Sequence, residues 1–287
     1  RNNLLRLADH PSHPKNWRPT TLVLSGNPQS RETLSHFAIW IESGRGVMTL
    51  AQIIVGRFEE RRDERQAALD QLRDYIREHQ LAAFAEVIVA TNLDEGITNL
   101  VQAHSIGPLK PNVVVTGWAT SPERRGAFCE HLRLIESLDM SHVITVDHGL
   151  PAPIKVKRID VWWRGQDNGS LMMILAYLIT LNWEWSRSRI RILRAIRSGD
   201  DEEQARREVE RLIDAARVDA EIVTPISDRF DEALVHWSGD ADVVMLGFMI
   251  PKDRDAAAEW LARWDGLLSD MPTTLLVRSS GDADLFA

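Results

Sequence analysis

The chain has 287 residues, of which 44% are hydrophobic and 26% charged, and its formal net charge is -8. This composition is typical of a globular protein with room for about two domains, and the negative charge disfavours general nucleic-acid binding, which needs a positive surface. The single cysteine, Cys129, excludes an intramolecular disulfide and a thiolate zinc cage and indicates a reducing, intracellular compartment. No signal peptide is evident, and no apolar run reaches the roughly 18 residues that a membrane-spanning helix needs.

Strand and helix patterns alternate through the first half of the chain. We expect strands at 21–26, within 47–56, and at 85–90, 112–117 and 142–147. Helices are expected at 30–43, at 58–80, from Asp94 onward and from Ser121 onward. A parallel neighbour can be reached only through a long connection, so this alternation predicts a five-stranded parallel sheet with helices on both faces.

The same cycle restarts after the segment GLPAPIKVK (149–157), whose prolines and glycine are typical of a connector. Here we expect strands at 159–163, 189–196, 220–225, 242–247 and 273–278, with helices near 171–181, 201–216, 228–237 and 253–268. The apolar helix at 171–181 is predicted to be buried on all sides. Asp228 is predicted to be the N-cap of the helix that follows it.

The two halves are predicted to be an internal duplication. PNVVVTGWATSPE (111–123) and ADVVMLGFMIPKD (241–253) share a buried strand, a glycine, an aromatic residue and a short loop. The fold class is therefore α/β: two similar five-stranded parallel-sheet units in tandem, of universal-stress-protein-like or Rossmann-like type. The predicted domains are residues 1–148, which include an N-terminal linker tail at 1–19, a connector at 149–158, and residues 159–287.

The common catalytic motifs are absent from the sequence. It contains no G-x-S-x-G elbow, no P-loop, no H-E-x-x-H and no G-x-G-x-x-G after a strand. We therefore predict no catalytic residues and no enzyme activity. His10 and His13 have a chelating spacing but no third ligand nearby, so we predict no metal site and no cofactor.

Nucleotide binding is the remaining chemical possibility. In an open parallel sheet, phosphates bind beyond the carboxyl ends of the strands, where the chain order reverses. The units resemble universal stress proteins, some of which bind ATP, but Thr120 and Ile250 stand where the second glycine of that family's phosphate loop belongs. The loops that a nucleotide would use are Ser25, Gly26 and Asn27 together with Thr116, Gly117 and Trp118.

The strand expected at 189–196 departs from the buried pattern, because Arg189 and Arg191 alternate with Ile190 and Ile192. One interpretation is a solvated edge strand that is protected by its charges. The other is a basic surface at a contact between subunits. In that interpretation Arg189 and Arg191 are the interface candidates.

Several stretches of the chain resemble, in order, segments of one known family. They are KNWRP (15–19) with LVLSG (22–26), QAHSIGPLKPNVVVTGW (102–118), IDVWW (159–163) with DNGSLMMILAYLIT (167–180), and LLVRSSG (275–281). Together they are similar to the cytosolic C-terminal domain of cation-chloride cotransporters, the membrane carriers that move chloride with sodium or potassium. Animal members carry a long polar insertion between the halves, whereas the connector here is short, so the chain resembles a prokaryotic-type member.

The resemblance implies that the chain is a fragment, preceded by a transmembrane domain that binds the ions and carries out transport. It implies a regulatory and dimerisation domain at the cytoplasmic face of the cell membrane, without catalysis of its own. The implied partners are a second copy of the chain and its own N-terminal transmembrane domain, and not nucleic acid. The alternative function is a tandem universal-stress-protein-like protein that binds a nucleotide.

The same resemblance makes residues 1–19 a linker that leads into the first strand. Pro14 and Pro19 are expected to hold this entry extended. Trp17 is the predicted linker anchor, packed against the domain with its indole N–H satisfied. Arg18 is expected to support the anchor through an ion pair.

Overall fold

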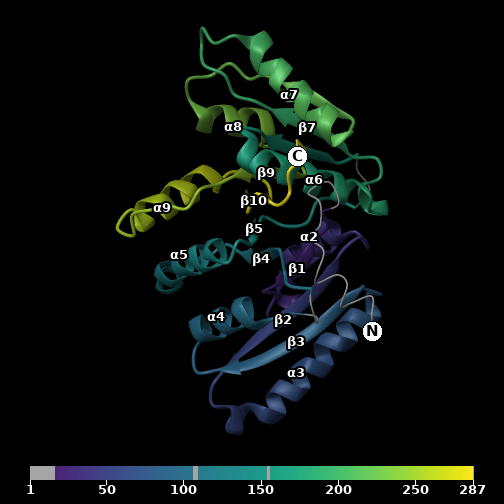
Figure 1. Cartoon of the computed structure of the whole chain (residues 1–287), viewed down its shortest axis with the longest axis vertical. Helices are drawn as coiled ribbons and strands as arrows, with labels where there is room; N and C mark the ends of the chain where they lie inside the picture. Colours follow the sequence, from purple (N-terminus) through teal and green to yellow (C-terminus); the bar gives the residue numbers. More distant parts are fainter. Residues whose placement is uncertain (1–16, 106–108, 154–155, 287) are drawn as a thin grey trace. The chain divides into compact units, whose positions relative to one another are not determined.

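Strands and helices alternate along the whole chain in the computed structural model, which describes residues 17–105, 109–153 and 156–286 (Figure 1). The chain divides into two units, Arg1–Val143 and Ile144–Ala287. The domain limits expected from the sequence, at 148 and 159, stay a prediction.

The first unit is a parallel sheet with helices between its strands. Its strands lie in the order β3-β2-β1-β4-β5, and β1 pairs in parallel with both β2 and β4, as β2 does with β3. The elements are β1 (Thr20–Val23), η2 (Pro28–Arg31), α2 (Glu32–Glu42), β2 (Val47–Val55), α3 (Phe58–Glu78), β3 (Ala83–Ala90), α4 (Leu93–Ala103), β4 (Val113–Gly117), α5 (Pro122–Ser137) and β5 (Ser141–Val146).

Helices cover both faces of this sheet, as expected. On one face, Leu22 of β1 and Val114 of β4 are buried in a core cluster with Ile97 of α4 and Ile135 of α5. Successive strand residues point to opposite faces, so the residues next to Leu22 and Val114 face the other layer. There α2 contacts β1 and β4, and α3 lies across the strands from α4 (Figure 1).

The second unit repeats this arrangement. Its strands lie in the order β10-β9-β6-β7-β8, and β6 occupies the place that β1 has in the first unit, with parallel neighbours on both sides. The pairs β10 with β9 and β7 with β8 are parallel too. The elements are β6 (Arg158–Trp162), α6 (Gln166–Thr180), η3 (Trp183–Trp185), β7 (Arg189–Leu193), α7 (Glu202–Ala216), β8 (Ala220–Val223), α8 (Phe230–Ser238), β9 (Val243–Gly247), α9 (Ala257–Leu268) and β10 (Thr274–Arg278). The predicted fold class is confirmed.

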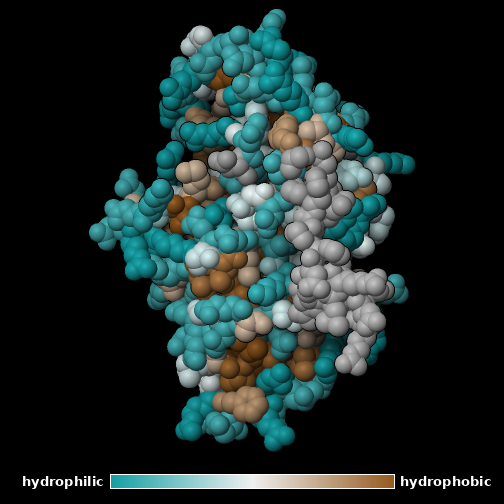
Figure 2. Space-filling view, in the orientation of Figure 1, coloured by the Kyte–Doolittle hydropathy of each residue, from teal (hydrophilic) through white to brown (hydrophobic). Residues whose placement is uncertain are grey.

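The surface helices are amphipathic. In α7 the buried residues Ala205, Val209 and Leu212 recur at helical spacing, while the surface over this helix is hydrophilic in the space-filling view (Figure 2). This pattern explains why a helix so rich in charge packs firmly on the sheet.

The apolar helix α6 begins at Gln166, earlier than expected, and runs to Thr180. Leu171, Met173 and Ile179 are fully buried, but Tyr177 is 39% exposed. The expectation of burial on all sides therefore holds for most of the helix and is wrong at its last turn.

Two local expectations in this unit are wrong. The helix α8 begins at Phe230, and its N-cap is Arg229, whose backbone is extended, and not Asp228; the Ser227 hydroxyl accepts the Arg229 N–H at 3.1 Å. The strand β7 is not an edge strand: it lies between β6 and β8. Its arginines are tolerated there because Arg191 has a charged partner inside the unit, described below.

Candidate functional site

The carboxyl ends of β1 and β4 form the edge where this fold binds ligands in the first unit, because the chain order reverses between them. The Leu24 N–H donates to the Val115 carbonyl at 2.9 Å, which holds the two strand ends together. The structure thus brings the two predicted nucleotide loops, 25–27 and 116–118, to one edge of the sheet.

The polar groups of the first loop are engaged within the loop and its neighbours. Gly26 has a φ of 60°, in the left-handed region that favours glycine, and its N–H donates to the Ala51 carbonyl at 3.1 Å. The Ser25 hydroxyl donates to the Gly26 carbonyl at 3.2 Å, and the Asn27 side chain accepts the Gln29 N–H at 3.0 Å, which caps η2. These hydrogen bonds stabilise the turn itself and occupy the loop's side-chain polar groups.

The second loop is held in a similar way. The Thr116 hydroxyl lies 2.8 Å from Nε2 of His142, a residue of β5 that is 1% exposed. The Trp118 ring packs edge-on against Phe128 of α5, with 5.5 Å between the ring centroids. Trp118 therefore connects the loop after β4 to the middle of α5.

Two arginines give this edge a positive charge. Arg31 ends η2, and its Nη1 lies 3.8 Å from the place where a Cβ at Gly117 would be. Burial, and after it the guanidinium of Arg124, lower the pKa of Arg31. Neither arginine contacts a carboxylate within the part of the chain that the structure describes. Two neighbouring cations repel each other, so an anion bound between them would be stabilised.

The equivalent edge of the second unit is closed by a side chain of the protein itself. Asn168 of α6 donates through Nδ2 to the Phe248 carbonyl at 3.2 Å and accepts the Ser279 N–H through Oδ1 at 2.8 Å. A Cβ added to Gly247 would lie 2.9 Å from Nδ2 of Asn168. Asn168 therefore joins the loops that follow β9 and β10.

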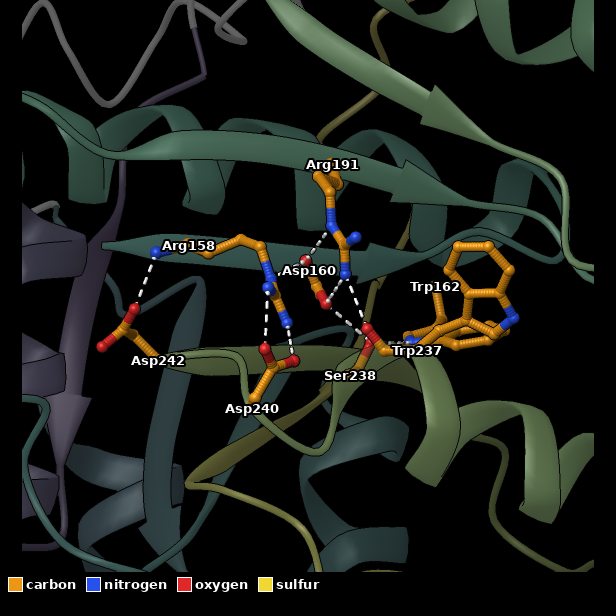
Figure 3. A network of polar contacts seen from close by, with 8 residues as sticks. All are labelled: Arg158, Asp160, Trp162, Arg191, Trp237, Ser238, Asp240 and Asp242. Atoms are coloured by element: carbon orange, nitrogen blue, oxygen red, sulfur yellow. Dashed lines mark hydrogen bonds and ion pairs between the residues drawn. The ribbon is translucent and has the colours of Figure 1, made fainter. Parts of the chain in front are cut away.

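A buried ion network connects three elements of the second unit (Figure 3). Asp160 of β6 is fully buried, and Arg191 of β7 donates to both of its carboxylate oxygens, at 2.9 and 2.7 Å. The Ser238 hydroxyl at the end of α8 donates to the same carboxylate at 2.7 Å, and accepts the indole N–H of Trp162 at 3.0 Å. Arg191 also donates to the Trp237 carbonyl at 2.7 Å.

A second arginine extends the network toward the surface. Nε of Arg158 forms an ion pair with Asp160 at 3.3 Å, and its other nitrogens bind the exposed Asp240. The hydrogen bond from Arg158 lowers the pKa of Asp240. Asp242 accepts the Arg158 backbone N–H at 2.9 Å. The network thus ties the loop between α8 and β9 to β6 and β7.

The two interface candidates have different environments. The Arg191 side chain is only 13% exposed and is bound to Asp160, so most of it is unable to reach a partner. Arg189 at the start of β7 is exposed. Which surface pairs with another subunit stays a prediction.

Trp17 is buried, at 5% exposure. Its indole nitrogen has no hydrogen-bond partner among the described residues, in contrast to the expected satisfied N–H. Arg18 donates to the Trp17 carbonyl at 2.7 Å, and it has no ion pair with any residue that the structure describes. Pro14 lies outside the described residues, and the role of Trp17 as linker anchor stays a prediction.

No group of three or more histidine, cysteine, aspartate or glutamate side chains in the described ranges could hold a metal ion. His10 and His13 lie outside those ranges. In the same ranges, no helix is both long and apolar enough to cross a bilayer.

The sequence interpretation missed the Asp160 network. Its signal was present in IDVWW, where one aspartate interrupts an otherwise apolar strand next to a strand with arginines at alternate positions. A buried carboxylate needs a charged partner, so the two patterns together could have predicted the pair.

The fold, a tandem of two α/β units, resembles that of universal stress proteins. A universal stress protein from Archaeoglobus fulgidus matches with a TM-score of 0.58 at 12% identity, over 92% of this chain and 97% of that chain. A functionally unknown protein from Pseudomonas aeruginosa matches with a TM-score of 0.55 at 13% identity, over 92% and 94%.

The sequence shows the family. The pattern of solute carrier family 12 matches residues 31–128 and 151–229, which is more than half of the chain, so the chain belongs to solute carrier family 12. The cytoplasmic domain of a prokaryotic cation chloride cotransporter has a similar structure, with a TM-score of 0.62 at 15% identity over 93% of this chain and 98% of that chain. The predicted resemblance to this family is confirmed.

Proposed function

We propose that the chain is the cytoplasmic domain of a cation-chloride cotransporter, attached at the cytoplasmic face of the cell membrane to a transmembrane domain of the same protein. The observation that carries this proposal is the family match over residues 31–128 and 151–229. The similar cotransporter domain, matched over nearly its whole length, supports it. An upstream coding sequence with roughly twelve hydrophobic spans would agree with the proposal, and a start codon next to Arg1 would contradict it.

The role that we propose for the domain is regulation and dimerisation, without catalysis of its own. A symmetric contact between two copies would hold two transport domains in register. A signal that changes this contact would then shift the conformational populations of the attached transport domains. The two well-packed parallel sheets are compatible with such a role.

Sedimentation velocity tests the dimer directly. The monomer has a mass of 32.6 kDa, and we expect a species of twice that mass at micromolar concentration. A monomer throughout the concentration range would contradict dimerisation. Regulation is tested in vesicles that contain the whole transporter, where removal of this domain should change chloride-dependent cation uptake while the transmembrane part stays inserted.

Nucleotide binding is the second candidate function, and the positive edge formed by Arg31 and Arg124 is the observation that favours it. A phosphate near the loops 25–27 and 116–118 would relieve the repulsion between the two guanidinium groups. A titration with dye-labelled ATP should show saturable binding that Arg31→Gln weakens. The control is Arg62→Gln, an exposed arginine of α3. Absence of binding would contradict this function and leave the first proposal intact.

A further inference from the structure

Trp183 is the most exposed of the large hydrophobic side chains that the structure describes, at 83%. It begins the short helix η3, directly after α6. The next tryptophan in this turn, Trp185, is fully buried, and Nζ of Lys157 lies 5.4 Å above its ring and donates to the Glu184 carbonyl at 2.8 Å. The buried Trp185 and the Lys157 contact fix the position of η3, and Trp183 projects from it into the solvent.

Two further side chains that precede Trp183, at the end of α6 and its C-cap, are partly exposed. Tyr177 is 39% exposed and Leu181 is 37% exposed. They are four residues apart, so they lie on one side of the helix. We call Tyr177, Leu181 and Trp183 the aromatic ridge. Exposed apolar groups that gather in this way mark a surface that binds a partner.

Exposed arginines follow the ridge. Arg187 and Arg189 are exposed, and neither contacts a carboxylate within the described residues. Within that part of the chain, their charges are therefore not neutralised by a direct ion pair, in contrast to Arg73 with Asp70 and Arg207 with Glu203.

The acidic groups of the region leave a small positive excess. By the register of β7 with β8, the residues just before β8 lie beside the start of β7. Arg217 and Asp219 lie there, and their charges offset each other. Glu184 offsets one of the two arginines that follow the ridge. One net positive charge therefore remains next to the aromatic ridge, on a chain whose net charge is -8.

We propose that the aromatic ridge, with Arg187 and Arg189, binds the headgroup region of an anionic lipid bilayer. Tryptophan and tyrosine are enriched at the membrane–water interface, where their rings lie among the headgroups and their polar atoms remain hydrated. Arginines near the surface attract anionic lipids. A single projecting ring needs no pocket in a deformable headgroup layer, whereas a protein partner would have to supply one. The competing occupant is a second copy of the chain, as predicted for Arg189 from the sequence.

This inference rests on the proposed function, because a contact of this size is weak unless the domain is already held at the membrane. One tryptophan and a small excess charge give only marginal, reversible binding. A covalent connection to a transmembrane domain supplies a high effective concentration, so that even weak contacts form. The contact would then fix the orientation of the second unit against the membrane.

The experiment uses the whole 287-residue chain with an N-terminal histidine tag, held on vesicles that contain a small fraction of nickel-chelating lipid. The vesicles are otherwise phosphatidylcholine alone or an equal mixture of phosphatidylcholine and phosphatidylglycerol, with brominated acyl chains that quench tryptophan at the interface. We expect quenching on the anionic vesicles that Trp183→Ser removes. On the tethered chain, Arg187→Gln and Arg189→Gln should each weaken the contact about fivefold and reduce the quenching accordingly.

Matched controls are available in the same unit. Met249, after β9, is 76% exposed, and Arg197 and Arg263 are exposed elsewhere. Met249→Ser and the double variant Arg197→Gln with Arg263→Gln should leave the quenching unchanged. The proposal is overturned if wild type shows no quenching on anionic vesicles, if the controls lose it equally, or if Trp183→Ser abolishes a dimer in sedimentation without lipid while quenching persists. Sedimentation without lipid also reports on the proposed dimer independently of this test.

Discussion

Asp160 and Arg191 form a two-point ion pair between neighbouring strands, in which Nε and Nη2 of Arg191 donate to the two carboxylate oxygens at 2.9 and 2.7 Å. The two residues are direct partners in the register of β6 and β7. Because Asp160 is fully buried, its negative charge is stable in the interior only while the hydrogen bonds from Arg191 are intact. The pair explains how a strand that carries arginines can lie inside the sheet.

We therefore expect Asp160→Asn to destabilise the second unit by about 3–5 kcal/mol, since it leaves Arg191 and part of Arg158 without their counter-charge. Urea unfolding followed by tryptophan fluorescence measures this change, because Trp162 donates to Ser238 within the same network.

The control for this variant is Asp240→Asn. The Asp240 side chain is 81% exposed, so the loss of its contact with Arg158 should cost at most about 1 kcal/mol. Equal effects of the two substitutions would show that burial of Asp160 does not decide the stability of the network.

Much of the fold could be predicted from the sequence, because each buried parallel strand is a continuous apolar run between helical patterns. Val113 and Val114, and likewise Val243 and Val244, are fully buried as such runs require. The edge assignment of β7 failed for a physical reason. Alternating arginines indicate a polar face, but only the position of Asp160 in the neighbouring strand shows whether that face is solvent or a buried carboxylate.

The candidate sites were less predictable, because they depend on contacts between residues far apart in the sequence. The loops 25–27 and 116–118 lie at one edge because they follow neighbouring strands, β1 and β4, but their use by a nucleotide stays a prediction. The arginines of that edge, Arg31 and Arg124, carry no local motif. The closure of the second edge by Asn168 could not be predicted either, because its partners Phe248 and Ser279 lie about a hundred residues away in the chain.

The two duplicated edges provide a matched pair of glycine substitutions. In Gly247→Ala the new Cβ would lie 2.9 Å from Nδ2 and 3.1 Å from Cβ of Asn168, so the asparagine must shift and weaken its two hydrogen bonds. We expect a loss of about 1–3 kcal/mol in the free energy of unfolding. In Gly117→Ala the nearest atom is Cδ1 of Leu34 at 3.5 Å, an ordinary contact, and the change should stay within about 0.5 kcal/mol. Urea midpoints of both variants measure the difference, and equal losses would contradict the closure by Asn168.

The first unit should lose stability in mild acid because of His131. Burial lowers the pKa of His131 from its ordinary value of 6.5, Asp94 at 3.4 Å raises it, and Arg124 lowers it. Below pH 6.5 the unfolded chain binds a proton that the folded chain does not, so stability is complete above this pH and declines as the pH falls toward the lowered folded pKa. His104, whose pKa is also lowered by burial, acts in the same direction.

Urea midpoints at about pH 7.5 and pH 5.5 test this dependence. The midpoint of the wild type should fall over this interval, and His131→Gln should reduce the fall. If the midpoint of His131→Gln fell as much as that of the wild type, His131 would not be a cause of the loss of stability in acid.

Two tryptophans of opposite exposure test the predicted linker anchor. Trp17 is 5% exposed and precedes β1, whereas Trp183 is 83% exposed. Trp17→Ala should cost about 3–5 kcal/mol, because it leaves a cavity beside the first strand. Trp183→Ala should change stability by no more than about 0.5 kcal/mol, since its ring is already in water. Thermal unfolding measures both. If Trp17→Ala were as mild as Trp183→Ala, the segment before β1 would not be anchored by this ring, and the entry to the domain would depend instead on backbone contacts such as the bond from the Thr20 N–H to the Asn112 side chain at 2.8 Å.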